Sequence, residues 1–139
     1  MAESLEWEQV DDVMVVKTRP GPIPDDRWNR YIEDVAKDSV RLVLALVWGS
    51  ITITATQRRS AADVLKRKGS RAVVLTDSRI SRGVLTAVSW LGGNIQGYPW
   101  SQLEQAVEDA GGESETKVKL RDVSRKYYQS VQGTDEGES

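Results

Sequence analysis

Apolar and polar residues follow two different periods along this chain, and these predict strands and helices in turn. Residues 5–10 alternate apolar side chains with glutamates, whereas residues 13–18 begin with four consecutive apolar residues. Alternation is typical of a half-exposed strand, and a continuous apolar run is typical of a strand buried on both faces. With Asp11 and Asp12 between them, the two segments predict an N-terminal β-hairpin.

Helical and extended segments then alternate as far as Gly111. The predicted order is a helix capped by Asp25, a buried strand over 40–48, a helix over 56–68, a strand over 71–76, a helix capped by Ser78 or Ser81, an edge strand over 94–98, a helix opened by a capping box at Ser101, and a helix over 116–131. Residues 49–55 fit either a further strand or a loop that leads into the next helix. This alternation predicts an α/β sandwich.

The tryptophans and the apolar stripe of one helix predict which residues are buried in the core and which are exposed. The helix that follows Ser78 is expected to bury Ile80, Val84, Ala87, Val88 and Leu91. Trp28 and Trp48 occupy core-type positions, whereas Trp7, Trp90 and Trp100 are less easily buried. Exposed aromatic residues often anchor protein interfaces, and the alternative is partial burial under the C-terminal helix.

Composition indicates one folded domain with modest extensions. The chain has 139 residues, of which 39% are hydrophobic and 29% are charged. Its longest apolar run, residues 42–48, is far shorter than the roughly 20 residues needed to span a bilayer. The N-terminal segment is acidic and does not resemble a signal peptide, so we expect a cytoplasmic protein without a membrane span.

The positive charge is concentrated in the middle of the chain. Residues 56–82 carry eight basic and two acidic side chains, a net charge of +6 in a protein whose overall charge is −2. Such a segment attracts an acidic partner or a phosphate, although the same residues could be the solvated faces of two helices. Nucleic acid is a disfavoured partner because no aromatic residue interleaves with the basic ones.

The residue types argue against catalysis. The sequence contains no histidine and no cysteine, which removes the usual general base at neutral pH, the thiol nucleophile and any disulfide. The carboxylates stand at predicted helix caps and on exposed helix faces, no phosphate-binding glycine motif is present, and no residues have metal-ligand spacing. We therefore expect no enzyme activity, no cofactor and no metal.

The order of predicted elements between Leu5 and Gly111 resembles the STAS domain of anti-sigma-factor antagonists. The similarity is carried by the strand VRLVLALVWG, the helix QRRSAADVLKRKG and the strand AVVL with the helix after it. It implies a mixed, mostly parallel sheet with an N-terminal hairpin and helices packed against it. It also implies a regulatory or adaptor protein that binds another protein.

The resemblance further implies a phosphorylation switch at the start of the helix after the buried strand. That family carries an Asp-Ser-Ser/Thr-Gly motif there; residues 50–56 have the hydroxyl groups but neither the Asp nor the Gly. Thr54 and Thr56 are the candidate phosphoacceptors, and capping of the helix is the alternative role for these residues. The predicted partner-binding residues are Thr52, Arg58, Arg59, Arg79 and Arg82.

Two other functions remain open at this point. A related α/β fold family holds lipids between sheet and helix, so the chain could bind a lipid or another small apolar ligand. That function requires a sizeable apolar cavity lined from residues 28–36 and 80–91. An immunity-type protein that neutralises a toxin would show the same absence of catalytic residues.

The chain is expected to comprise a STAS-like domain over 1–112, a C-terminal amphipathic helix over 113–131 and, from its polar and acidic composition, a disordered tail over 132–139. The helix carries five basic and three acidic side chains and two adjacent tyrosines. It could pack back on its own domain, cover the sheet edge, pair two protomers as a homodimer or dock on a partner.

Overall fold

Strands and helices follow one another in the order that the hydrophobic pattern predicts. The computed structural model describes residues 3–132, so most of the predicted tail lies outside the described residues. The elements are β1 (Leu5–Val10), β2 (Val13–Thr18), α1 (Asp25–Val35), β3 (Leu42–Val47), α2 (Ala55–Lys68), β4 (Ala72–Leu75), α3 (Arg79–Trp90), β5 (Ile95–Tyr98), the 3-10 turn η1 (Trp100–Gln102), α4 (Leu103–Ala110) and α5 (Ser114–Val131). The predicted α/β class is confirmed.

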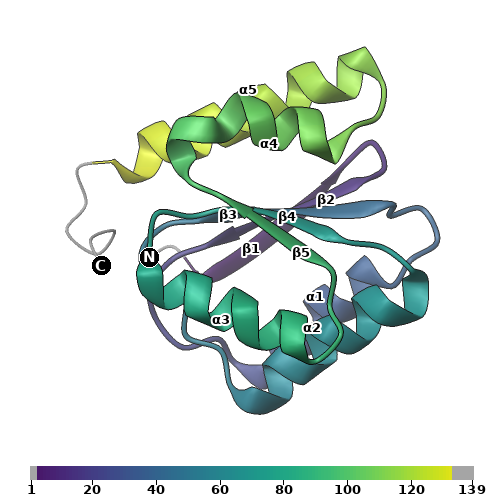
Figure 1. Ribbon diagram of the computed structural model, residues 1–139, viewed down its shortest axis with the longest axis vertical. Helices are drawn as coiled ribbons and strands as arrows, with labels where there is room; N and C mark the ends of the chain where they lie inside the picture. Colours follow the sequence, from purple (N-terminus) through teal and green to yellow (C-terminus); the bar gives the residue numbers. More distant parts are fainter. Residues whose placement is uncertain (1–2, 133–139) are drawn as a thin grey trace.

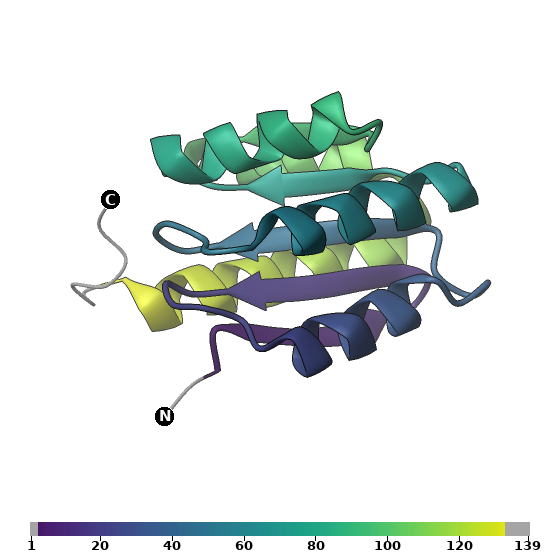
Figure 2. The ribbon, with the colours of Figure 1, turned by 90° about the horizontal axis from the view of Figure 1, so that it is seen from below.

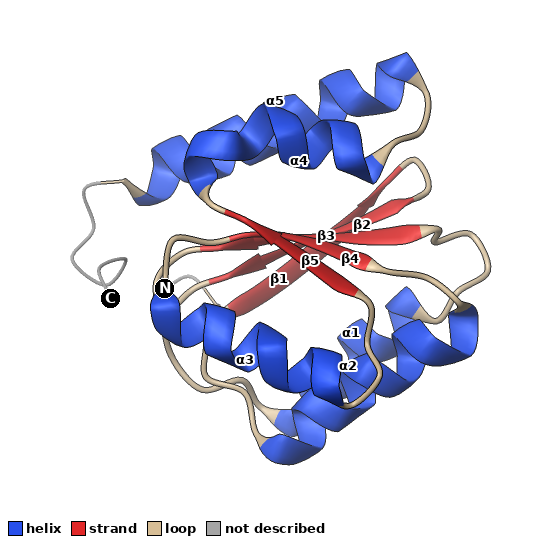
Figure 3. Ribbon diagram, viewed as in Figure 1, coloured by secondary structure: helices blue, strands red, loops and turns tan. Residues whose placement is uncertain are grey.

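The sheet has five strands in the order β1-β2-β3-β4-β5. β1 is antiparallel to β2, and each later neighbour is parallel. From β2 onward each connection moves one strand in the same direction, and because such crossovers are right-handed, α1, α2 and α3 lie on one face. Figures 1 and 3 show these three helices on one side of the sheet and α4 and α5 on the other. Figure 2 shows α1, α2 and α3 side by side in front of the strands.

The two faces of β2 enter two separate cores, which explains its continuous apolar run. Met14 and Val16 pack in the core between the sheet and α1–α3. Val13 and Val15 pack with residues of α4 and α5 on the opposite face. Successive strand residues point to opposite faces, so a strand covered on both sides needs apolar residues at every position.

α5 packs back on its own domain. Leu120, Tyr127 and Val131 are buried in the same core as Val13 and Val15. The hairpin tip is fastened to the same helix, because the Thr116 hydroxyl donates to Asp11 Oδ2 at 2.6 Å. The apolar stripe of α5 is thus buried within its own domain. A homodimer formed through this helix would have to use the opposite, outer face of α5.

Three local predictions are wrong, each for a local reason. Pro24 rather than Asp25 occupies the N-cap of α1, and Asp25 is the first helical residue. Ser101 lies in η1, and α4 begins at Leu103 without a side-chain cap. Ile80 is 61% exposed rather than buried. The inward face of α3 instead begins at the buried Ser81, whose hydroxyl donates to the Gly49 carbonyl, so a polar residue conceals the true stripe.

We predict that replacing Trp7 with phenylalanine raises the pKa of Asp34. The Trp7 indole donates to Asp34 Oδ2 at 2.7 Å and Lys37 lies 3.1 Å from Oδ1, and these hydrogen bonds lower the pKa of that carboxyl. A lowered folded-state pKa contributes stability that is present above the unfolded value of about 4 and is lost as the pH falls through the folded value. Carboxyl NMR titration measures the pKa directly.

The pH dependence of the urea unfolding midpoint should change as a result of the raised Asp34 pKa. The wild-type midpoint is expected to fall with pH below about 4 more steeply than that of Trp7→Phe. Asp34→Asn is the control, because it removes the titrating group and leaves the indole in place. An unchanged Asp34 pKa in Trp7→Phe would contradict the assignment.

Candidate functional site

The joint between β3 and α2 is a loop at the carboxyl end of the parallel strands. Of the two alternatives for residues 49–55, the loop is observed, with one isolated bridge between Pro22 and Thr52. The loop is fastened to the start of α3: the Ser81 hydroxyl donates to the Gly49 carbonyl at 3.0 Å and accepts from the Ile51 N–H at 3.1 Å. These two hydrogen bonds therefore hold the β3–α2 loop against the first turn of α3.

Thr54 caps α2. Its hydroxyl accepts from the Gln57 N–H at 3.1 Å, and the Gln57 side chain accepts from the Thr54 N–H at 3.0 Å, which is a capping box. Gln57 is buried and also donates to the Ile23 carbonyl. Thr54 and Thr56 are both exposed, but the Thr54 hydroxyl is held by this capping contact, whereas Thr56 lies in the first turn of α2.

A groove of about 400 Å³ separates the first half of α2 from the last turns of α3. It is lined by Ala55, Thr56, Arg58, Arg59, Ala87, Trp90 and Leu91. Trp90 is 85% exposed, which places a large aromatic surface beside Arg59 in water. The groove thus joins an apolar surface to two guanidinium groups.

The groove brings together only part of the predicted partner-binding set. Of that set, Arg58 and Arg59 line it, together with the candidate phosphoacceptor Thr56. Thr52 is exposed in the preceding loop, and Arg79 and Arg82 are exposed in the first turn of α3, outside the groove. The sequence missed Ala87 and Leu91, which the predicted stripe assigned to the core. The expected exposure of Trp90 was the signal for this site.

The cations of this face lack acidic partners. Among the described residues, no carboxylate lies within ion-pair distance of the four arginines named above. Arg58 is held only through Nη1, which donates to the Ile53 carbonyl at 3.0 Å. On the opposite face, α5 pairs its cations with acidic side chains: Lys117 with Glu108, and Arg121 and Arg125 with Glu104. Unpaired positive charge is thus concentrated on α2 and α3.

The other tryptophans are accounted for by packing. Trp100, expected to be hard to bury, is 4% exposed and stacks on Tyr128. Trp48 packs edge-on against the same ring. Trp7 is partly buried, with the Arg27 guanidinium 5.1 Å from its ring centre. Trp90 is therefore the tryptophan whose surface the fold leaves open.

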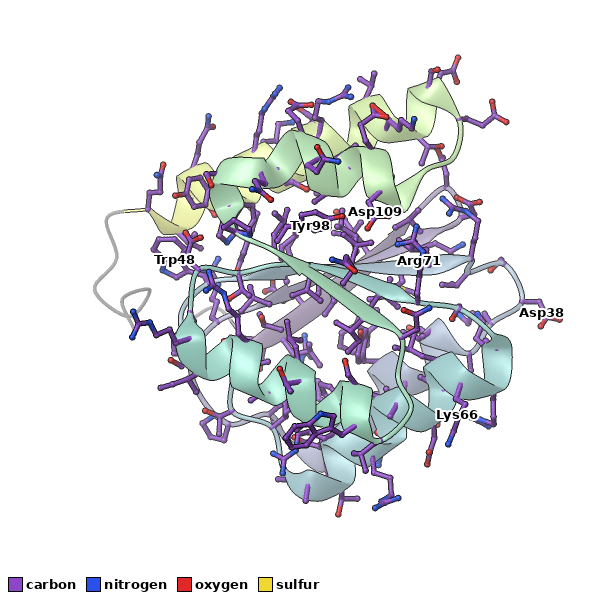
Figure 4. The ribbon with its side chains drawn as sticks, in the orientation of Figure 1. Asp38, Trp48, Lys66, Arg71, Tyr98 and Asp109 are labelled. Carbon is purple, nitrogen blue, oxygen red and sulfur yellow. The ribbon has the colours of Figure 1, made fainter. Side chains whose placement is uncertain are left out.

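A polar cluster formed by Tyr98, Asp109 and Arg71 is structural. The Tyr98 hydroxyl donates to Asp109 Oδ2 at 2.8 Å, and Arg71 Nη1 lies 3.2 Å from Asp109 Oδ1; Figure 4 shows the three side chains converging between the sheet and α4. The hydrogen bond to Asp109 raises the pKa of Tyr98, which makes the phenol a poorer proton donor near neutral pH. No group of three or more acidic side chains in the described part of the chain could hold a metal ion.

An apolar cavity of about 90 Å³ lies between the sheet and α1–α3. Its lining includes Trp28, Tyr31 and Val35 from α1 and Val84 and Val88 from α3, the two segments that ligand binding would require. Pockets for drug-sized ligands have volumes of roughly 300–1,000 Å³. The cavity is in the expected place but has less room than a lipid chain needs.

Comparisons with protein-family models, with curated proteins and with solved structures give no match to this chain. Within residues 3–132, no helix combines the length and the apolar character that a membrane crossing requires.

Proposed function

We propose that this chain is a non-enzymatic, STAS-like regulatory or adaptor protein that binds another protein through the groove between α2 and α3. The observation that carries the proposal is Trp90, which is 85% exposed in that groove beside Arg59. Tryptophan and arginine are the side chains that most often dominate binding energy at protein interfaces. An aromatic ring left in water gains the free energy of apolar burial when a partner covers it.

The arrangement of strands supports the STAS-like part of the proposal. An antiparallel hairpin leads into parallel strands that are added in one direction, with α1, α2 and α3 on a single face. This is the mixed, mostly parallel sheet that the resemblance implies.

Charge supports an acidic surface on the partner. Arg59, Arg79 and Arg82 are exposed and have no carboxylate partner among the described residues. A guanidinium group can bind a carboxylate through two parallel hydrogen bonds, which favours arginine at such interfaces. An acidic segment that also covers Trp90 would use both properties of the groove.

Within this proposal, Thr56 is a better phosphoacceptor than Thr54. Phosphorylation of Thr54 would replace the hydroxyl that caps α2, whereas Thr56 does not cap the helix and lines the groove with Arg58 and Arg59. A phosphate adds a charge of about −1.5 to −2. It would neutralise the neighbouring guanidinium groups and repel an acidic partner.

Affinity purification from the native cell, with mass spectrometry of bound proteins and modifications, tests the proposal. We expect the wild-type protein to retain one specific partner, and Trp90→Ala and Arg59→Glu to lose it. With that partner purified, either change should raise the Kd about 30-fold, as expected for a residue that dominates an interface. The melting temperature should stay nearly constant because both side chains are exposed.

Val118→Ala is the matched control. Val118 is 60% exposed and apolar like Trp90, but it belongs to α5 on the opposite face of the sheet. Its replacement should leave the Kd unchanged. Equal retention of the partner by the wild type and Trp90→Ala would refute the groove as the binding surface.

A further inference from the structure

The 90 Å³ cavity has walls that are almost entirely apolar. Its lining residues come from the strands and from α1, α2 and α3. Its lining includes Val16, Trp28, Val74, Ala61, Leu85 and Val88. Within the described residues, two hydroxyl-bearing side chains contribute to the same wall: Thr18 at the end of β2 and Tyr31 of α1.

The Thr18 hydroxyl has no hydrogen-bond partner. The residue is 7% exposed, and its Oγ1 is one of two buried side-chain polar atoms in the described part of the chain without a partner. The backbone of Thr18 is satisfied, because its carbonyl accepts from the Trp48 N–H and from the Tyr127 hydroxyl. Thr18 shares a strand face with Val16, two residues earlier, so its side chain points to the cavity side of the sheet.

A buried hydroxyl that lacks a hydrogen-bond partner in an apolar cavity favours a bound ligand over a bound water molecule. Leaving a buried hydroxyl without a partner costs about 1–3 kcal/mol. A buried water typically makes about three hydrogen bonds, whereas this wall supplies two hydroxyl groups, those of Thr18 and Tyr31. The indole N–H of Trp28 already donates to the Ser60 hydroxyl. Cavities with such walls remain dry and bind small apolar molecules.

We propose that this cavity is a binding site for a small amphiphile, a molecule with an apolar body and one oxygen that hydrogen-bonds to Thr18 Oγ1. A 150 Å³ cavity holds the six carbons of benzene, so 90 Å³ takes about four non-hydrogen atoms. Short alcohols and ketones have this size and polarity. The site is independent of the partner-binding groove, because it lies under the helices rather than on their outer surface.

The wall formed by α2 and α3 is partly open to solvent and offers a route into the cavity. Ala61, Val84 and Leu85 line the cavity and are only partly buried. α3 buries only Ser81 and Val88 among its residues, so it is held against the sheet by few side chains. A small outward movement of α3 would admit a molecule of this size.

Titration with propan-1-ol, followed by methyl NMR of the full chain, tests the proposal. We expect saturable shifts of the Val16, Val74 and Val88 methyl groups, which line the cavity. The methyl groups of Val13 and Val15 are the internal control, because they face the opposite core on the same strand. Uniform shifts on both faces, or shifts that do not saturate, would overturn the site.

Substitutions at Thr18 distinguish the contribution of its hydroxyl to ligand binding from that of the cavity volume. Thr18→Val keeps the shape and should weaken propan-1-ol binding about fivefold, the loss of one neutral hydrogen bond, while leaving xenon binding unchanged. Thr18→Ser should retain wild-type affinity. Ala45→Ile, which fills the cavity from β3, should abolish the binding of both probes. Equal propan-1-ol affinity in the wild type and Thr18→Val would overturn the role of the hydroxyl.

Discussion

Replacing Trp100 with alanine is expected to lower the free energy of unfolding by about 3–5 kcal/mol. The side chain is 4% exposed and its ring stacks on Tyr128 at 4.7 Å between ring centres. Its indole N–H donates to the Val47 carbonyl at 2.9 Å, at the end of β3. The substitution therefore removes a large buried surface and a ring contact and leaves a buried carbonyl without its donor. Urea unfolding measures the change.

Trp100→Phe and Trp90→Ala divide this effect into its parts. Trp100→Phe keeps an aromatic ring but loses the hydrogen bond, so a smaller loss of about 1–2 kcal/mol is expected. Trp90→Ala removes the same residue type from a position that is 85% exposed and should be nearly neutral for stability. If Trp100→Ala and Trp90→Ala had equal effects, the central packing role of Trp100 would be wrong.

Lys68→Met is expected to lower the free energy of unfolding by about 3 kcal/mol. The Lys68 ammonium donates to the carbonyls of Val35, Lys37 and Val40, at 2.7, 2.7 and 2.6 Å. The first of these carbonyls belongs to the last turn of α1, where helix carbonyls lack partners and a cation is favoured. Burial lowers the pKa of Lys68, yet the three hydrogen bonds need its ammonium form. Methionine keeps most of the apolar stem and supplies no donor.

Lys66→Met is the matched control for this prediction. Lys66 belongs to the same last turn of α2 and is exposed, and Figure 4 shows it on the outer side of the helix. It forms no ion pair among the described residues. Its replacement should change stability by less than about 0.5 kcal/mol in urea unfolding. A loss of stability equal to that of Lys68→Met would show that the positive charge of the last turn stabilises the fold, rather than the hydrogen bonds of Lys68 to the three carbonyls.

Local pattern predicts much of the fold because periodicity reports which faces a segment buries. The hairpin, the buried β3 and the helix stop at Gly69, whose φ is 63°, all agree with prediction. The predicted stripe of α3 failed at Ile80 because the inward position belongs to Ser81, a polar residue whose hydrogen bonds to the β3–α2 loop satisfy it. Hydrophobicity alone does not reveal a buried polar residue whose partners are distant in sequence.

The candidate site was predictable in its residue types but not in its assembly. The basic segment and the exposure expected of Trp90 were both readable from the chain. The groove exists because the end of α3, with Trp90, and the first half of α2, with Arg59, line one opening, an arrangement set by how the two helices pack on the sheet. No local pattern specifies that arrangement, since it results from packing between elements.

The sequence by itself determined the α/β class, the order of the elements and the absence of histidine and cysteine chemistry. Each depends on residue type or on the period of a single segment. The tertiary structure decided which carboxylates neutralise which cations, that Trp100 is buried and Trp90 is not, and that Thr18 is left unpaired beside a cavity. Those facts depend on contacts between residues far apart in the chain, and the chain forms such contacts only when the sheet and its two helical layers close around their cores.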